Sequence, residues 1–365
     1  MSWRDGVHIT GTPIWCDARR RRDVCFLSSA DRVGRAGHGQ LIATPITLAL
    51  LGVRDQGHLA VPLRQRFTLG TLRLELIPSG RGFGAAALHV DIAGKTVLYA
   101  GVVRTAASGV SDAAELRTCD ALVVAAPYGE EQHRFPALGA AIDATIDWAR
   151  GALASERRPV LLVDSLLDGL EVASRLSAEG IAIAGPRALR EAGQRIADLV
   201  PHPNRLEPGL SQRSIARDPR AGGRSAAASA ATAPSELTGH APSTAPSATA
   251  TAIPTIVAPG REPRAIIWLE ADRAGLARAV GERGVTTALV SARAAAGDAT
   301  GFDAAFAWTA AADRAQLLGW IEATGARDVF VTGACAEAIV AALGARARVI
   351  GPPQQMSLFP HEAFT

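Results

Sequence analysis

The chain has 365 residues, 48% of them hydrophobic, and a net charge of +3 at pH 7. Such a chain can bury a sizeable core and has room for two domains, which excludes a wholly disordered protein. No apolar run reaches the roughly 20 residues of a membrane-spanning helix, and the first residues lack the layout of a signal peptide, so we expect a cytoplasmic protein without a membrane partner. The mildly basic balance permits a nucleic-acid partner without demanding one.

Four cysteines, Cys16, Cys25, Cys119 and Cys335, are scattered along the chain without a CxxC pair. Three of them lie in apolar runs that read as strands or helices. We therefore expect buried free thiols rather than disulfides or metal ligands.

The first third of the chain reads as many short strands separated by Gly, Pro and Asp. Several of these strands alternate in polarity, which is typical of half-buried strands. The predicted strands span residues 7–9, 23–27, 40–43, 65–68, 71–77, 87–92, 96–99 and 121–124. The sequence therefore predicts a sheet-rich N-terminal part.

Helices and strands then alternate. A helix is predicted at 138–155, where Ala141, Ile142 and Ile146 recur at near-helical spacing. A strand at 159–163, a helix at 167–178, and a further short strand and helix up to residue 199 follow. This alternation predicts an α/β unit.

From about residue 207 to 261 the composition shifts to Ala, Ser, Thr, Pro and Gly. Such a segment has too few large apolar groups to offset the loss of chain entropy on folding, so we expect a disordered linker. Ordered structure is predicted to resume at residue 265. The predicted order is strand 265–269, helix 273–283, strand 286–291, helix 314–324, strand 328–331, helix 336–343 and strand 348–350, which is a parallel α/β pattern.

Two glycine-containing motifs of the N-terminal part carry a family resemblance. Ile77–Ala86 reads IPSGRGFGAA, and Val97–Val103 reads VLYAGVV. Together they resemble a signature of the metallo-β-lactamase/β-CASP nucleases, in which a His follows the first Ser-Gly and an Asp follows the second Gly. Here Arg81 and Val102 stand at those positions. A guanidinium keeps its proton and a valine has no lone pair, so neither side chain can bind zinc.

The region Phe26–Arg35, followed by ATPIT at 43–47, resembles the ligand loop of the same family. With a small deletion in the alignment, Asp31 is retained and Arg32 replaces the last His. The two earlier His positions are lost or occupied by Ser29. The strand Cys119–Gly129 also resembles a family strand, but the acidic residue at its end is absent.

The C-terminal part shows similar replacements. Residues 305–313 resemble the family segment Phe-x-x-Ser-Asp-His-Ala-Asp, with Ala310 and Ala311 in place of the catalytic Asp-His and with Asp313 retained. Residues 323–333 resemble the strand that leads to a terminal His ligand, where Gly333 stands instead. A two-metal hydrolase needs its ligands to hold two ions about 3.5–4 Å apart. Vestigial Asp31 and Asp313 cannot do so alone.

The resemblance implies an α/β (α+β) fold, a metallo-β-lactamase-like sandwich with a reduced β-CASP-like α/β unit. The expected parts are the sandwich at 1–157, the reduced unit at 158–206, the linker at 207–261, a C-terminal α/β part that completes the fold at 262–351 and a tail at 352–365.

The replaced ligands imply a non-catalytic homologue without a cofactor, acting as an accessory or scaffold factor in DNA repair or replication. Two alternatives remain open at this point. One is an active DNA or RNA exonuclease that holds zinc through diverged ligands, and the other is a purely structural partner of a repair enzyme.

Basic residues gather in front of the altered ligand loop. Arg19, Arg20, Arg21 and Arg22 form a continuous run, and Arg32 and Arg35 follow closely. Guanidinium groups suit phosphates, so the run is a candidate nucleic-acid contact. A solvated turn is the alternative.

The tail contains a candidate docking motif after the pair Pro352-Pro353. Gln355, Met356, Ser357, Leu358 and Phe359 resemble the peptide with which bacterial replication and repair proteins bind the β sliding clamp. Methionine replaces leucine at the second position, which nearly conserves volume. The alternative is that Leu358 and Phe359 pack against their own domain.

Overall fold

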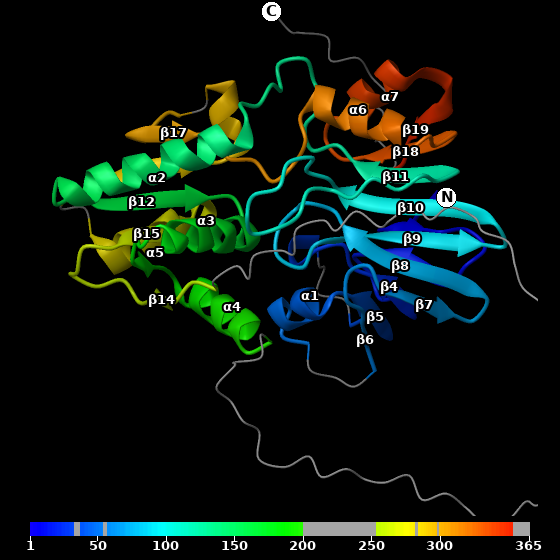
Figure 1. Ribbon diagram of the computed structural model, residues 1–365, viewed down its shortest axis with the longest axis horizontal. Helices are drawn as coiled ribbons and strands as arrows, with labels where there is room; N and C mark the ends of the chain where they lie inside the picture. Colours follow the sequence, from blue (N-terminus) through cyan, green and yellow to red (C-terminus); the bar gives the residue numbers. More distant parts are fainter. Residues whose placement is uncertain (33–36, 54–56, 200–252, 282–283, 298, 353–365) are drawn as a thin grey trace, which may run out of the picture. The chain divides into compact units, whose positions relative to one another are not determined.

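The computed structural model describes residues 1–32, 37–53, 57–199, 253–281, 284–297 and 299–352 (Figure 1). The described residues form a mixed α/β fold with three sheets. Apart from Pro352, the predicted tail lies outside the described residues, as does most of the predicted linker.

Sheet A has the strand order β1-β2-β3-β4-β5-β6. Its strands are β1 (Ser2–Trp3), β2 (Val7–His8), β3 (Ile14–Cys16), β4 (Val24–Phe26), β5 (Gln40–Ala43) and β6 (Leu59–Ala60). The pairs from β1 to β3 are antiparallel, and those from β3 to β6 are parallel. Helix α1 (Pro45–Leu50) follows β5, with Thr44 as its N-cap and Pro45 in its first turn. With six residues, α1 is too short to show a helical period, and the sequence did not predict it.

Sheet B has the order β19-β18-β11-β10-β9-β8-β7. Its strands are β7 (Arg66–Leu69), β8 (Leu72–Pro78), β9 (Ala86–Ile92), β10 (Lys95–Val102), β11 (Ala121–Ala125), β18 (Asp328–Thr332) and β19 (Ala347–Val349). Strands β7 to β10 form an antiparallel meander, whereas β10, β11, β18 and β19 are parallel to one another. Sheet B is therefore completed by strands from the far end of the chain.

Sheets A and B pack face to face. Buried residues of both, including Val7, Phe26, Leu76, Leu88 and Val123, share one apolar core. The other face of sheet B is covered by α6 (Arg314–Ala323) and α7 (Ala336–Leu343) (Figure 1). The other face of sheet A packs against α1. Successive side chains of a strand point to opposite faces, so apolar residues of the same strands supply the cores on the two faces of each sheet.

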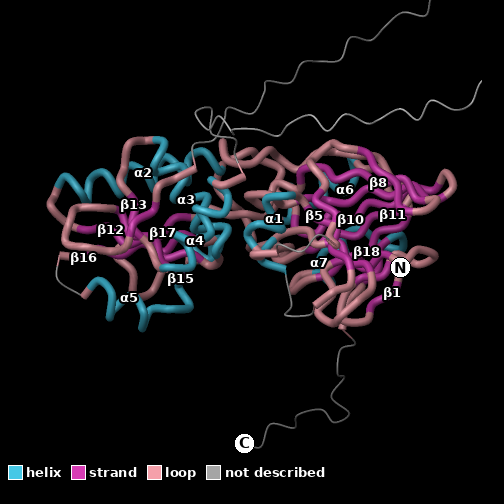
Figure 2. The backbone as a smooth tube through the Cα atoms, turned by 90° about the horizontal axis from the view of Figure 1, so that it is seen from below, coloured by secondary structure: helices cyan, strands magenta, loops and turns pink. Residues whose placement is uncertain are grey.

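Sheet C is entirely parallel and has the order β14-β13-β15-β12-β16-β17. Its strands are β12 (Arg158–Val163), β13 (Ile183–Ala184), β14 (Ile256–Val257), β15 (Ala265–Leu269), β16 (Val285–Val290) and β17 (Ala304–Phe306). Helices α2 (Leu138–Ala154), α3 (Leu166–Ala178) and α4 (Arg187–Ala197) cover one face. Helix α5 (Arg273–Val280) packs on the opposite face, and α2 and α5 are seen on either side of the strands in Figure 2.

Two features of sheet C differ from the sequence-based expectation. Strand β14 falls in the last residues assigned by composition to the linker, because Ile253 and Ile256 pack against the core beside α4. Strand β17 was not predicted, since Ala304–Phe306 is short and carries two alanines. The four cysteines are buried and free, which confirms the expected thiols.

The order of the strands makes a prediction about chain cleavage. In sheet C, β12 and β13 come before the undescribed segment 200–252, and each pairs with strands that follow it. In sheet B, β11 likewise pairs with β18. We expect that cleavage at a protease site inserted between residues 207 and 250 leaves the two fragments associated on size-exclusion chromatography. They should separate only in denaturant, and separate elution in buffer would contradict this strand order.

Candidate functional site

A cleft of about 260 Å³ brings together several of the positions singled out in the sequence. Asp31, Arg81, Val102, Ala310 and Ala311 all line it. They come from four separate segments of the chain, so their convergence is a property of the fold. The cleft is the candidate functional site.

Turns at strand ends position these residues. Asp31 lies in a 3₁₀ turn, η1 (Ala30–Arg32), shortly after β4, and Val102 is the last residue of β10. Arg81 follows β8 and is preceded by Gly80, whose φ is +81°. A Cβ atom on Gly80 would lie 2.2 Å from the backbone oxygen of Arg104, so only glycine fits there.

The Arg81 guanidinium bridges two carboxylates. Its Nη1 donates to Oδ1 of Asp168 at 2.7 Å, and its Nη2 donates to Oδ2 of Asp31 at 2.6 Å. The three side chains are only 14–22% exposed. Burial lowers the pKa of Arg81, but the negative charges of Asp168 and Asp31 outweigh this effect and raise the pKa above its usual value. The guanidinium therefore stays charged.

Helix α3 contributes the Asp168 side of this bridge. Ser165 is the N-cap of α3, and its hydroxyl accepts from the Asp168 backbone N–H at 3.2 Å. The same hydroxyl lies 3.2 Å from Nη2 of Arg81 and donates to Asp168 at 2.7 Å. The cap therefore fixes the start of the helix and the acceptor carboxylate together.

A second arginine is bound to α3 one turn further along. Arg104 and Glu171 form a bidentate pair with distances of 2.6 and 3.0 Å, and their side chains are 2% and 4% exposed. Trp308 donates its indole N–H to Glu171 at 2.9 Å, and Ser111 accepts from Arg104 at 2.6 Å. These bonds satisfy most of the polar atoms of a pair that would otherwise be costly to bury.

Two further polar side chains line the cleft. Tyr128, from the motif after β11, and Asp164, at the end of β12, both line it. Burial, followed by the negative charges of Asp164 and Asp168, raises the pKa of Tyr128. The Ser291 hydroxyl donates to Asp164 at 2.5 Å, and Arg293 lies 3.4 Å from its other oxygen.

The remaining predicted positions lie elsewhere or have other roles. Gly333 has a φ of +104°, and a Cβ there would be 2.8 Å from the Ala126 oxygen, so this glycine shapes a turn. Ser29 is buried. Asp313 is the N-cap of α6 in a capping box with Gln316, and it accepts from the backbone N–H of Phe135 at 3.3 Å. The Arg32 side chain and all of Arg35 lie outside the described residues, as does the motif Gln355–Phe359.

The residues present do not fit a metal pair. Of the cleft residues singled out by motif, only Asp31 is a carboxylate, and it is bonded to a guanidinium. Across the described parts of the chain, no group of three or more His, Cys, Asp or Glu side chains is arranged to hold a metal ion. Zinc requires such ligands in a cluster.

Sequence reasoning missed Ser165, Asp168, Arg104 and Glu171. A signal for the first two was available, because Ser-x-x-Asp directly after the apolar strand 159–163 is a helix-capping pattern. The Arg104–Glu171 pair joins residues 67 positions apart, and no local pattern announces it.

The arginine run is divided by the structure. Arg22 lies over the ring of Trp15 at 3.9 Å, and His8 stacks on the same tryptophan with ring centroids 4.6 Å apart. Arg20 pairs with Asp5 at 3.0 Å on the surface. Arg19, Arg20 and Arg21 are exposed. Arg22 is therefore held in a structural stack, whereas the three preceding side chains face solvent.

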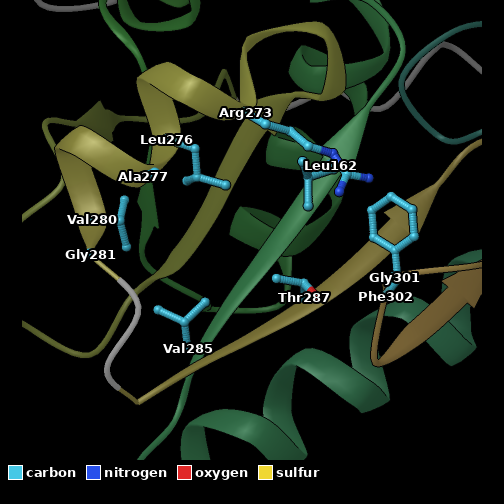
Figure 3. Close-up of a pocket in the computed structure, with 10 residues that line it drawn as sticks. All are labelled: Leu162, Arg273, Leu276, Ala277, Val280, Gly281, Val285, Thr287, Gly301 and Phe302. Carbon is cyan, nitrogen blue, oxygen red and sulfur yellow. The ribbon is translucent and has the colours of Figure 1, made fainter.

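A second cavity, of about 240 Å³, lies between α5 and sheet C (Figure 3). Its lining is mainly apolar and includes Leu162, Leu276 and Val280. The Arg273 guanidinium lies 4.4 Å from the ring centre of Phe302 and pairs with Glu270 at 3.3 Å. This cavity contains no pair of groups suited to acid-base or nucleophilic chemistry, so it is not the candidate site.

Comparisons with known proteins add little to this geometry. No family model and no curated protein matches the sequence. Among solved structures, the chain is similar to a protein of unknown function from Enterococcus faecalis V583, with 11% identity and a TM-score of 0.48 over 84% of this chain and 74% of that one. None of the helices in the described ranges has the length and apolar character needed to cross a membrane.

The buried pair predicts a stability loss. Changing Arg104→Ala should lower the free energy of unfolding by about 3–5 kcal/mol, because Glu171 would be left buried without its arginine partner. The matched control is Arg150→Ala, whose pair with Glu179 has side chains 48% and 37% exposed and should contribute about 0–1 kcal/mol. Urea denaturation measures both, and equal losses would show that burial of the pair is unimportant.

Proposed function

We propose that this protein is a catalytically inactive relative of the metallo-β-lactamase/β-CASP nucleases that acts as an accessory or scaffold factor in DNA repair or replication. One observation carries the proposal. Five residues aligned by motif with functional positions of that family line a single cleft, although they come from four distant segments. Unrelated motif matches would have no reason to converge.

The chemistry of the cleft supports the absence of catalysis. Arg81, Val102, Ala310 and Ala311 supply a guanidinium, a branched alkyl group and two methyl groups where hydrolysis requires metal ligands and an acid-base pair. The Arg81 guanidinium also repels divalent cations from Asp31, the retained motif carboxylate that lines the cleft. Sheets A and B pack face to face, and sheet C is inserted between β11 and β18. This arrangement supports the proposal, because the resemblance implies a sandwich with an inserted α/β unit.

Metal content and nuclease activity test this proposal. The purified wild-type protein should contain far less than one zinc per chain by mass spectrometry, and it should degrade neither single-stranded DNA nor RNA with added metal. The comparison variant R81H/V102D/A310D/A311H restores four potential donors in the cleft and should gain zinc. Two tightly held metals in the wild type, or a metal-dependent nuclease activity abolished by Asp31→Asn, would overturn the proposal and favour the exonuclease with diverged ligands.

A role in DNA maintenance is supported by two features outside the cleft. Arg19, Arg20 and Arg21 are exposed and can contact phosphates without disturbing the stacked Arg22. The sequence Gln355–Phe359 resembles a sliding-clamp ligand. We propose that the clamp is the principal partner and that DNA or RNA contacts are secondary.

The clamp interaction is tested with tail variants. Docking Leu358 and Phe359 in an apolar pocket should stabilise the complex by about 3–6 kcal/mol before ordering losses, giving roughly micromolar affinity. The double change Leu358→Ala and Phe359→Ala should abolish binding to purified clamp in isothermal titration calorimetry. Phe364→Ala, outside the motif, is the control and should bind as the parent does. Equal binding by the double variant would remove the clamp from the proposal.

A further inference from the structure

The Arg81 guanidinium occupies a place where two carboxylates would otherwise repel one another. Asp31 and Asp168 both lie within 2.7 Å of its nitrogens, and each is about one-fifth exposed. Two carboxylates that lie close together in a partly buried place repel one another unless a cation lies between them. Arg81 supplies this cation from within the chain.

The bridge also has a mechanical consequence for α3. Asp168 and Glu171 are three residues apart, so they share one face of the helix. Arg81 binds the first and Arg104 binds the second, and both arginines follow strands of sheet B. The first turns of α3 are therefore held to loops after β8 and β10 by two ionic contacts, while Arg81 also ties down η1 through Asp31.

We propose that Arg81 is an internal substitute for a bound metal ion, and that its guanidinium joins η1, the loop after β8 and the start of α3 without any bound ion. The comparison with a metal rests on the proposed function, whereas the ionic bridge rests on the distances themselves. A planar guanidinium suits this place because it can donate to two carboxylates in different directions at once. The bridge thus holds the segments around Asp31, Arg81 and Asp168 together without a bound ion.

Removal of the guanidinium should convert the bridge into a cation-dependent one. In Arg81→Ala the carboxylates of Asp31 and Asp168 would lose their shared cation, and any ion that binds them in the folded state stabilises that state by mass action. Carboxylate oxygens suit hard divalent ions such as Mg²⁺, Ca²⁺ and Mn²⁺, and Mn²⁺ serves as the probe. Free guanidinium at millimolar concentration would replace the missing group directly.

Thermal unfolding by circular dichroism is the experiment. Without added ions, Arg81→Ala should melt about 5–10 °C below the wild type, the range expected for loss of one partner of a largely buried ionic bridge. Millimolar MnCl₂ or guanidinium chloride should restore at least half of that loss. The wild type should not respond to either ion or to EDTA.

The matched control is Arg64→Ala. Arg64 also bridges two carboxylates, those of Asp112 and Glu115 at 3.0 and 2.8 Å, but it is 55% exposed. Its loss should shift the melting temperature by about 2 °C or less and create no response to added ions. Adding Asp31→Asn and Asp168→Asn to Arg81→Ala should abolish the ion response, because the carboxylates are the proposed ligands.

An unchanged melting temperature in Arg81→Ala, or a loss that neither ion restores, would overturn the inference. If Arg81→Ala does not fold, Arg81→Gln carries the same test, since it removes the charge but retains part of the volume. The outcome is distinct from that of the proposed function. A wild type that holds zinc refutes the proposed function, whereas an Arg81 variant indifferent to cations refutes only the internal substitute.

Discussion

The arrangement of this protein depends on the burial of charge at the start of α3. Arg104 and Glu171 are almost completely buried, and leaving either without the other would cost several kcal/mol. Their geometry forces three parts of the chain into register: the loop after β10, helix α3 and the segment that carries Trp308 and Thr309. The cleft is formed by residues adjacent to these same parts, so its shape follows from the pair.

Charge balance explains the composition of the cleft. Asp31, Asp164 and Asp168 bring three negative charges, and Arg81 in the cleft and Arg293 beside Asp164 bring two positive ones. The partners are close enough to neutralise one another within the chain. The three carboxylates outnumber the two guanidinium groups by one, so a polyanionic backbone would meet more negative than positive charge there. The exposed arginines 19–21 before β4, by contrast, carry an excess of positive charge.

The order of strands gives the chain its tolerance for a long insertion. Sheet C interrupts sheet B between β11 and β18, and the segment 200–252 in turn interrupts sheet C between β13 and β14. Each interruption leaves from one strand and returns to a neighbour or near neighbour in the same sheet. Across these insertions, β11 pairs with β18 and β13 pairs with β14.

The sequence by itself determined most of the elements and the positions that later proved to line the cleft. Short strand-like runs bounded by Gly, Pro and Asp predicted most strands of sheet B, and near-helical spacing predicted α2, because both patterns are local. It also singled out Asp31, Arg81, Val102, Ala310 and Ala311 through motifs that can be read without a structure.

Only the tertiary structure decided what those positions do together. The Arg81 bridge joins residues 50 and 87 positions away, and the Arg104–Glu171 pair spans 67 positions. Asp313 shows that a motif resemblance does not define a role. Its segment resembles a metal-ligand motif, whereas its carboxylate is the N-cap of α6. Local patterns carry the propensity of a segment, whereas the partner of a charged side chain is set by the packing of segments that are distant in the chain.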